Sequence, residues 1–334
     1  LKRYALAPGE ALEIKEADLA GFLRQSVQGT LAVSDTPPID VRSAVRGLLT
    51  YPYGCAEQTT STAYPHVFID EAAAKQFGLK AYTPAQRAGI LDKASGRVVG
   101  LQAANGGVSL WGNLSGYQYW LSAYVAHFLL DAREQGFSVP VETEKKAVDF
   151  LLRGLQEGVA GLPRGPLKYE PTSVWADARY AGSGRFGVLA YGAYVLARQG
   201  KAPLATLRQL HEGMEQAHSG LALVQLGLAL HLMGDEARGK AAIDAGLKKP
   251  RSNDAYWWGD YGSALRDGAL SYVLLDKHNL KPEGRENLVS QVAAEVEKRR
   301  YFSTQEKLAL FLLGRSFATQ QTGEWAAEMT AGGK

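Results

Sequence analysis

The chain has 334 residues, enough for one large domain or about two of ordinary size. Apolar residues make up 46% of it and charged residues 21%, which excludes a disordered or collagen-like protein. The net charge of +3 is too small to indicate a nucleic-acid partner. The most continuous apolar stretch, residues 220–234, is interrupted by Gln225 and His231 and is shorter than the roughly 20 residues of a membrane-spanning helix, so we expect no span.

The first 35 residues differ from the rest of the chain. Charged side chains interrupt residues 1–19, so this stretch does not resemble a signal peptide. Residues 29–34 alternate in apolar character like a β-strand, and two prolines end the pattern. We therefore expect residues 1–35 to be an extended segment that belongs to a neighbouring β domain or a linker. Because the chain begins at Leu1 rather than at Met, we also expect it to be part of a longer protein.

From Val41 onward the sequence has a helical pattern. Apolar and small residues recur at intervals of three and four in roughly ten to twelve segments, separated by Gly, Pro or Asn. Three segments share a small residue, an aromatic residue and Val, at intervals of about 70 to 80 residues: 122–125, 192–196 and 270–275. That interval accommodates two helical hairpins, so we predict an all-α domain of stacked hairpins over residues 36–317 and a C-terminal exit segment at 318–334. An irregular helical domain of Ala-rich helices is the alternative.

The single cysteine lies in the segment that carries the most chemical information, Tyr51-Pro52-Tyr53-Gly54-Cys55-Ala56-Glu57-Gln58-Thr59-Thr60-Ser61. Gly54 allows a turn immediately before Cys55, and the acidic Glu57 suits the first turn of a helix. We therefore expect Cys55 at a helix N-terminus, where unpaired backbone N–H groups favour the thiolate. Residues three apart share a helix face, so the Cys55 sulfur can reach the carboxamide carbon of Gln58. This geometry permits the thiol to displace ammonia and form an internal thioester.

A thioester hydrolyses in water unless its site is dry. Tyr51, Tyr53 and Tyr64 are bulky residues close to Cys55 in the sequence, and we expect them to shield it. The alternative interpretation is that Cys55 is a small buried core residue, as most free cysteines are. The spacing of Cys, Glu and Gln, after Gly and between aromatic residues, favours the thioester.

The segment Gly54-Cys55-Ala56-Glu57-Gln58 resembles the thioester signature of the α2-macroglobulin and complement superfamily, and residues 51–61 resemble its bacterial branch. Three further segments are similar to family motifs: Tyr119–Val125 to a Trp-Leu-Thr-Ala-Tyr-Val helix, Asn105–Gly107 with Trp111 to a Gly-rich turn and its aromatic residue, and Ser303–Gln305 to a late Ser-Thr-Gln. The resemblance covers about residues 31–315. The family has Gly, or in bacteria often Leu, at the position of Ala56, which a first helical turn also accepts. The implied fold is an α/α toroid of paired helices, the thioester domain, in agreement with the hairpin pattern.

This resemblance implies the thioester domain of a bacterial broad-spectrum protease inhibitor. A cut in the bait segment of the parent protein would expose the thioester, Gln58 would acylate a Lys amine of the attacking protease, and Cys55 would be released as the thiol. The residues that would support the bond are Gly54, Glu57, Tyr51 and Tyr53. The reaction consumes the site, so the domain would be a single-use covalent trap in bacterial defence rather than an enzyme, without cofactor or metal. Neighbouring domains as partners and a periplasmic location, in a parent protein that a membrane anchor could hold, are further implications.

The nucleophile that the thioester accepts is the next implication of the resemblance. Some relatives carry a His well after the Cys, which attacks first and lets hydroxyl groups react. The matching stretch here, Glu170–Asp177, contains no His. By analogy with relatives that lack this His, we expect transfer mainly to amines such as protein Lys side chains.

Other patterns carry weaker signals. Gly182–Gly187 fits the Gly-x-Gly-x-x-Gly string of dinucleotide-binding folds, but no strand precedes it and no acidic residue follows at the expected distance, so we expect a turn between helices. His66 lies eleven residues after Cys55, which raises the possibility of a Cys-His dyad of a thiol hydrolase. The other histidines show no metal-ligand spacing: His127, His211, His218, His231 and His278.

The loop Asp254–Tyr261 is dense in aromatic and acidic residues. On an α/α barrel it could line a sugar-binding cleft with Asp254 or Asp260 as acid or base, because glycosidases use paired carboxylates. An aromatic cluster that packs one hairpin on the next is the alternative, and we favour it. Two rival functions therefore stand beside the thioester: an α/α-barrel carbohydrate-active enzyme, and an inert helical interaction module whose thioester never forms.

Overall fold

The computed structural model describes residues 9–15, 21, 41–49, 54–112, 117–162, 182–252, 259–320 and 328. Contacts divide the chain into two units, residues 1–38 with 322–334 and residues 39–321. In the first unit, the described residues 9–15 form no helix or strand, and the β-strand expected at 29–34 lies outside the described residues. The second unit contains every helix and strand named below.

The described part of the second unit is mainly helical. Its thirteen α-helices are α1 (Val41–Leu49), α2 (Ala56–Phe68), α3 (Glu71–Gln76), α4 (Pro84–Leu101), α5 (Tyr119–Glu134), α6 (Val141–Ala160), α7 (Gly182–Ala197), α8 (Leu204–Glu212), α9 (Gly220–Leu232), α10 (Glu236–Lys248), α11 (Ala264–Lys277), α12 (Asn287–Glu297) and α13 (Thr304–Gln320). A 3-10 helix (Met214–Gln216) follows α8. Two short antiparallel strands, β1 (Val108–Ser109) and β2 (Tyr117–Gln118), precede α5. The predicted all-α fold is confirmed.

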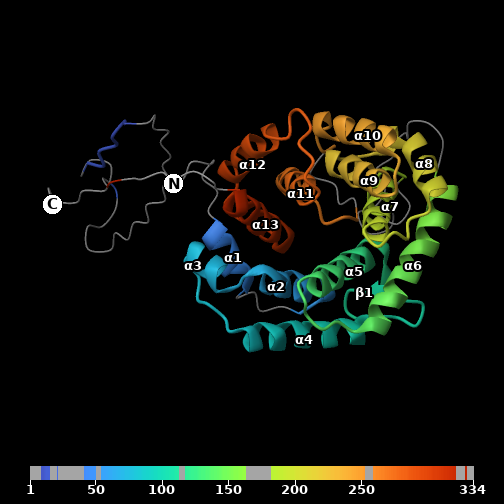
Figure 1. Ribbon diagram of the computed structural model, residues 1–334, viewed down its shortest axis with the longest axis horizontal. Coiled ribbons are helices and arrows are strands. Elements are labelled where there is room, and N and C mark those ends of the chain that lie inside the picture. Colours follow the sequence, from blue (N-terminus) through green and yellow to red (C-terminus); the bar gives the residue numbers. More distant parts are fainter. Residues whose placement is uncertain are drawn as a thin grey trace. The chain divides into compact units, whose positions relative to one another are not determined.

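The helices of this unit follow one another around a closed ring of two layers (Figure 1). In the inner layer α2, α5, α7, α9, α11 and α13 contact one another in that order, and α13 returns to α2. In the outer layer α4 packs on α2, α6 on α5 and α7, α10 on α9, and α12 on α11. Inner and outer helices thus alternate along the chain, which is the α/α toroid that the resemblance implies.

Two kinds of helix sequence produce the two layers. The inner helix α9 is apolar on almost every side, and residues 220–230 are all buried. The outer helix α6 buries a stripe at helical spacing and exposes charged residues on its other face; the stripe contains Ala147, Val148, Leu151 and Leu155. Where α9 meets α10, a Cβ on Gly220 would collide with the backbone carbonyl of Gly246. Small residues therefore let these two helix backbones touch.

Candidate functional site

Cys55 is the N-cap residue of α2, and Gln58 is the third residue of that helix. The backbone N–H of Gln58 donates to Cys55 Sγ, and the backbone N–H of Cys55 donates to Gln58 Oε1, each at 3.4 Å. The two side chains thus reach across the first turn in a reciprocal capping box. The predicted helix start at Cys55 is confirmed, and both side chains lie in the first turn of α2; a contact between the sulfur and the carboxamide carbon stays a prediction.

Water is largely excluded from the sulfur, because only 4% of Cys55 is exposed. Burial raises the pKa of the thiol, hydrogen bonds from the backbone at Gln58 and Glu57 lower it, and the charge of Glu57 raises it; the net pKa is above the ordinary value. The expectation that the helix N-terminus favours the thiolate is therefore wrong, since the loss of water outweighs the backbone donors. At this position the protonated thiol is favoured over the thiolate more than in an ordinary cysteine.

The residue before the cysteine does not use the conformational freedom expected of it. Gly54 lies outside the left-handed region, and a Cβ on it would meet no atom within 4 Å. The turn into α2 is held from the other side, where the backbone N–H of Ala56 donates to Leu110 O at 3.0 Å. The structure therefore supports this N-terminus through the loop between α4 and α5 and not through Gly54.

A glycine in that loop is required by its surroundings. Gly106 has a φ of 93°, and a Cβ on it would collide with the backbone carbonyl of Lys146 in α6. Asn105 Oδ1 accepts from the N–H of Gly107 at 3.0 Å and closes the turn. The Asn-Gly-Gly motif found in the sequence is thus the turn that lies against α6, in the loop that places Leu110 beside α2.

Glu57, the second residue of α2, is 5% exposed and binds the first turn of α13. Thr304 Oγ1 donates to the two carboxylate oxygens at 2.8 and 2.9 Å, and Gln305 Nε2 donates to Oε1 at 2.8 Å. Ser61, one turn along α2, donates to Oε1 at 2.7 Å. The late Ser-Thr-Gln motif is therefore part of the site, although Thr304 lies 247 residues after Glu57.

A third helix joins this arrangement through the Ser61 hydroxyl. Gln305 Nε2 also donates to Ser61 Oγ at 3.0 Å, and Tyr124 OH of α5 lies 2.8 Å from the same oxygen. Because the Ser61 proton is directed to Glu57, Tyr124 is the donor in this pair. We call these residues the Glu57 network: Glu57, Ser61, Tyr124, Thr304 and Gln305. It joins α2, α5 and α13 next to the reactive pair.

Tyr261 is a neighbour of the site that the sequence analysis missed. Its ring packs on Trp120 with 4.7 Å between centroids, and its OH donates to Gln118 Oε1 at 3.2 Å. Burial and the negative charges of Glu57 and Cys55 raise the pKa of Tyr261 to about 12, so its phenol lies within electrostatic reach of both groups. Its φ of 53° is unusual for a bulky residue, and no local sequence signal marks such a conformation.

The structure describes only one of the three tyrosines that we expected to shield Cys55. Tyr51 and Tyr53 lie outside the described residues. Tyr64 is described, and its expected place beside Cys55 is wrong: nine residues of helix separate them, about 14 Å at 1.5 Å per residue. Its OH donates instead to Asp131 Oδ2 at 2.6 Å.

The Cys-His dyad considered from the sequence does not form. His66 lies in the last turn of α2, about 16 Å along the axis from Cys55. Burial and the charge of Arg87 lower the pKa of His66 to about 4, and its ring packs edge-on against Tyr82. Among the described residues, no group of three or more His, Cys, Asp or Glu could hold a metal ion.

The Gly-x-Gly-x-x-Gly string begins a helix and does not form the turn that we expected. Gly182 is the first residue of α7, an inner helix of the ring. On that helix a Cβ at Gly187 would collide with the His218 ring. This glycine therefore serves close helix packing.

Asp260 is the described member of the carboxylate pair proposed for a sugar-cleaving site, and two arginines and a histidine surround it. Arg251 Nη2 donates to Oδ1 at 2.7 Å, and His218 Nε2 lies 2.9 Å from Oδ2. Arg266 lies 3.5 Å from Oδ2 and also donates to the backbone carbonyl of Asp260. Burial alone would raise the pKa of this carboxyl, but these three groups hold it well below its usual range. Asp254 lies outside the described residues.

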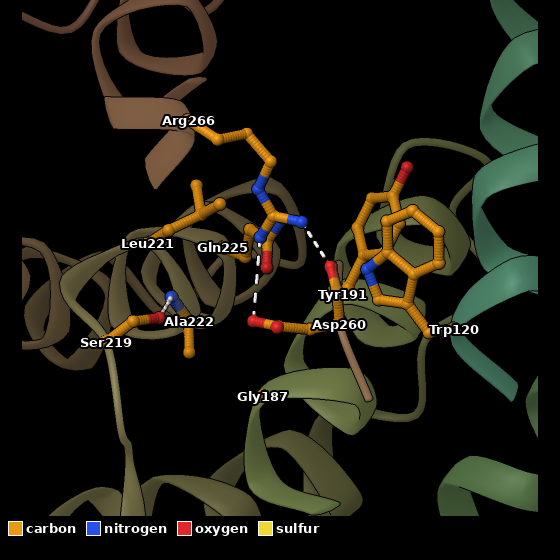
Figure 2. Close-up of a pocket in the computed structure, with 9 residues that line it drawn as sticks. All are labelled: Trp120, Gly187, Tyr191, Ser219, Leu221, Ala222, Gln225, Asp260 and Arg266. Atoms are coloured by element: carbon orange, nitrogen blue, oxygen red, sulfur yellow. Dashed lines mark hydrogen bonds and ion pairs between the residues drawn. The ribbon is translucent and has the colours of Figure 1, made fainter. Parts of the chain in front are cut away.

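A cavity beside Asp260 is too small for a sugar (Figure 2). Its volume is about 10 Å³, which is space for a single water molecule, and its walls include Trp120, Tyr191, Gln225 and Arg266. Asp260 therefore fixes the chain before α11 in an ion-pair cluster; the aromatic cluster favoured from the sequence stays a prediction, because residues 253–258 lie outside the described residues. The part of the chain that the structure describes also contains no helix long and apolar enough to cross a membrane.

Three comparisons with known proteins agree on one family. A family model described as "A-macroglobulin TED domain" matches residues 27–163. A protein named alpha-2-macroglobulin from Escherichia coli (strain K12) is 39% identical over 326 residues, which are 97% of this chain and 19% of that protein. The chain thus spans about a fifth of the length of the curated relatives that it matches first.

Solved structures show the same fold. The native alpha-2-macroglobulin of E. coli, from domain MG7 to the C-terminus, has a TM-score of 0.78 at 40% identity and covers 87% of this chain and 44% of that chain. Salmonella alpha-2-macroglobulin reacted with methylamine has a TM-score of 0.77 at 40% identity, over 86% of this chain and 18% of that chain. Trypsin-activated alpha-2-macroglobulin of E. coli has a TM-score of 0.72 at 40% identity, over 84% and 18%.

Proposed function

We propose that this chain, which belongs to the A-macroglobulin thioester-domain family, carries a thioester between Cys55 and Gln58 and traps proteases with it. The observation that carries the proposal is the capping box at the start of α2, in which the thiol and the carboxamide share one helical turn. The burial of Cys55 supports it, because a thioester persists only where water is scarce.

The bond forms from the chain itself. Cys55 Sγ attacks Gln58 Cδ, a C–S bond forms and the C–N bond of the carboxamide breaks. The thiol proton leaves with the nitrogen, so one molecule of ammonia is lost and no oxidant or cofactor is needed. The capping box assists this step because it keeps both side chains in the first turn of α2.

Capture of a protease reverses the formation of the thioester, except that a different amine takes the place of ammonia. A Lys amine of the protease attacks Gln58 Cδ, a C–N bond forms, the C–S bond breaks and its electron pair goes to Cys55 Sγ. The amine proton passes to the sulfur, whose pKa burial raises. The methylamine-treated Salmonella protein and the trypsin-activated E. coli protein support this choice of nucleophile and partner for the relatives. The site is used once, so the domain is a covalent inhibitor in a longer, periplasmic protein whose neighbouring domains complete the dry site.

Intact mass measurement tests the proposal directly. Freshly and gently prepared protein should have a mass lower than the sequence mass by one ammonia. Methylamine should free one thiol and add its own mass to Gln58, so that the product is heavier than the sequence mass by one CH2 group. The Cys55→Ala variant should show the full mass of its own sequence and no response to methylamine. A full mass and an immediately titratable thiol in the unmodified protein, in the longest form that can be prepared, would favour the inert helical module instead.

A further inference from the structure

Glu57 is a buried acid whose partners in the described part of the chain are all neutral. Hydroxyl groups of Ser61 and Thr304 and the carboxamide of Gln305 donate to its carboxylate at 2.7 to 2.9 Å. A buried carboxylate without a cation is costly unless several donors point at it. Tyr124 orients the Ser61 hydroxyl, so the network is arranged around a negative charge.

The position of this charge is fixed relative to the reactive pair. Glu57 is adjacent to Gln58 and two residues from Cys55 in the first turn of α2. Its charge raises the pKa of the Cys55 thiol and that of Tyr261. A negative charge held this close to the sulfur opposes a second negative charge on it, and the low exposure of both residues weakens screening by solvent.

We propose that Glu57 is a positioning residue of the thioester site: its carboxylate fixes the first turn of α2 to α13, and its charge slows the release of Cys55 as a thiolate. The inference rests on the proposed function. When an amine attacks Gln58 Cδ, the C–N bond forms, and the electron pair of the breaking C–S bond moves to Sγ. The charge of Glu57 opposes that movement, so the bond is less reactive toward adventitious amines and water than the same bond beside a neutral residue.

The test compares three variants in the methylamine-treated protein, where Cys55 is a free thiol, by the pH profile of its alkylation with iodoacetamide. Glu57→Gln removes the charge at nearly constant size and should give about tenfold more thiolate at a given pH near neutrality. Gln305→Lys places a cation against the same carboxylate and should shift the profile in the same direction. Thr304→Val removes one donor and keeps the charge, so its profile should stay within about twofold of the unmodified protein.

Release from the thioester is the second readout. Methylamine should free the thiol about three to ten times faster in Glu57→Gln than in the unmodified protein. The inference is overturned if Glu57→Gln and Gln305→Lys leave both the pH profile and the release rate unchanged, or if Thr304→Val shifts the profile as much as they do. Gln305→Lys keeps the test decisive if Glu57→Gln does not fold. Failure of the proposed function is a separate result, because it would show as the absence of ammonia loss in the unmodified protein, whereas the pH profile needs only the thiol.

Discussion

Gln305 Nε2 donates to Glu57 Oε1 at 2.8 Å across 248 residues of sequence. The bond joins the first turn of α13, the last helix of the ring, to the first turn of α2, which carries the reactive pair. This hydrogen bond therefore holds the first turn of α2 in place and also helps to close the toroid. A change that separates α13 from α2 therefore reaches the turn of Cys55 and Gln58 through the Glu57 network.

The first prediction concerns the stability of this closure. Gln305→Leu removes one buried donor from Glu57 and one from Ser61, so the free energy of unfolding should fall by about 1–3 kcal/mol. Urea denaturation followed by circular dichroism measures it. Gln291→Leu is the control, because Gln291 is exposed on α12, and it should change stability little. Equal stability of the two variants would contradict a structural role for this bond.

The second prediction concerns the shield. Tyr53→Ala and Tyr51→Ala should speed spontaneous thiol release without any protease, because loss of a ring opens a path for water and removes packing contacts. Thiol titration over time measures the rate. Tyr82→Ala is the matched control: Tyr82 packs on His66 at the other end of α2, so its variant should hydrolyse at the unmodified rate. Unchanged release in both Tyr51 and Tyr53 variants would mean that these rings do not protect the bond.

Local spacing was sufficient to predict the reactive pair. A helix that begins after Gly54 necessarily brings residues 55 and 58 to one turn, and the structure has them there. The ring was predictable for a similar reason, because repeated hairpins can bury their faces only against each other. Both predictions use information that lies within a few residues or within one repeat.

The rest of the site depends on contacts that no local pattern contains. Thr304 and Gln305 reach Glu57 from the far end of the domain. The pKa of Cys55 has the opposite direction to the one expected because burial in the folded domain, which the local sequence does not show, outweighs the backbone donors. Tyr261 enters through a left-handed backbone conformation that an aromatic residue rarely adopts. From the sequence we could identify the Ser-Thr-Gln motif, but we could not predict that its side chains bind Glu57.

The third prediction is a loss of stability in mild acid. Burial lowers the pKa of His66 to about 4 and that of His127 to about 3, while an unfolded imidazole has a pKa of about 6.5. Below pH 6.5 the unfolded chain binds protons that the folded chain does not, so the free energy of unfolding falls as the pH falls toward 4. Each of these residues should contribute about 2 kcal/mol of loss at pH 5 relative to pH 7.5.

His66→Phe provides the check on that assignment. The variant keeps an aromatic ring beside Tyr82 and has no group to protonate, so its loss of stability between pH 7.5 and pH 5 should be smaller by about 2 kcal/mol. Urea midpoints at the two pH values measure it. A His231→Phe variant is the control, since His231 is half-exposed at the end of α9. The same pH dependence in His66→Phe and in the unmodified protein would show that His66 does not contribute.

The last prediction concerns the choice of nucleophile, which follows from the absence of His in residues 169–179, a segment outside the described residues. A hydroxyl group needs a base to take its proton when it attacks a thioester, whereas an amine with some unprotonated fraction is already competent. The structure offers no substitute in the two histidines first considered: His66 lies about 16 Å along α2 from Cys55, and His127 contacts Tyr191 and Asp131. Methylamine should therefore free the Cys55 thiol readily, and glycerol should do so barely above the rate of hydrolysis, with Cys55→Ala unresponsive to both. Mass spectrometry of the Gln58 peptide distinguishes the amide, the ester and the acid. Rapid formation of the glycerol ester would contradict the prediction and would require a base from a part of the chain that the sequence motif does not identify.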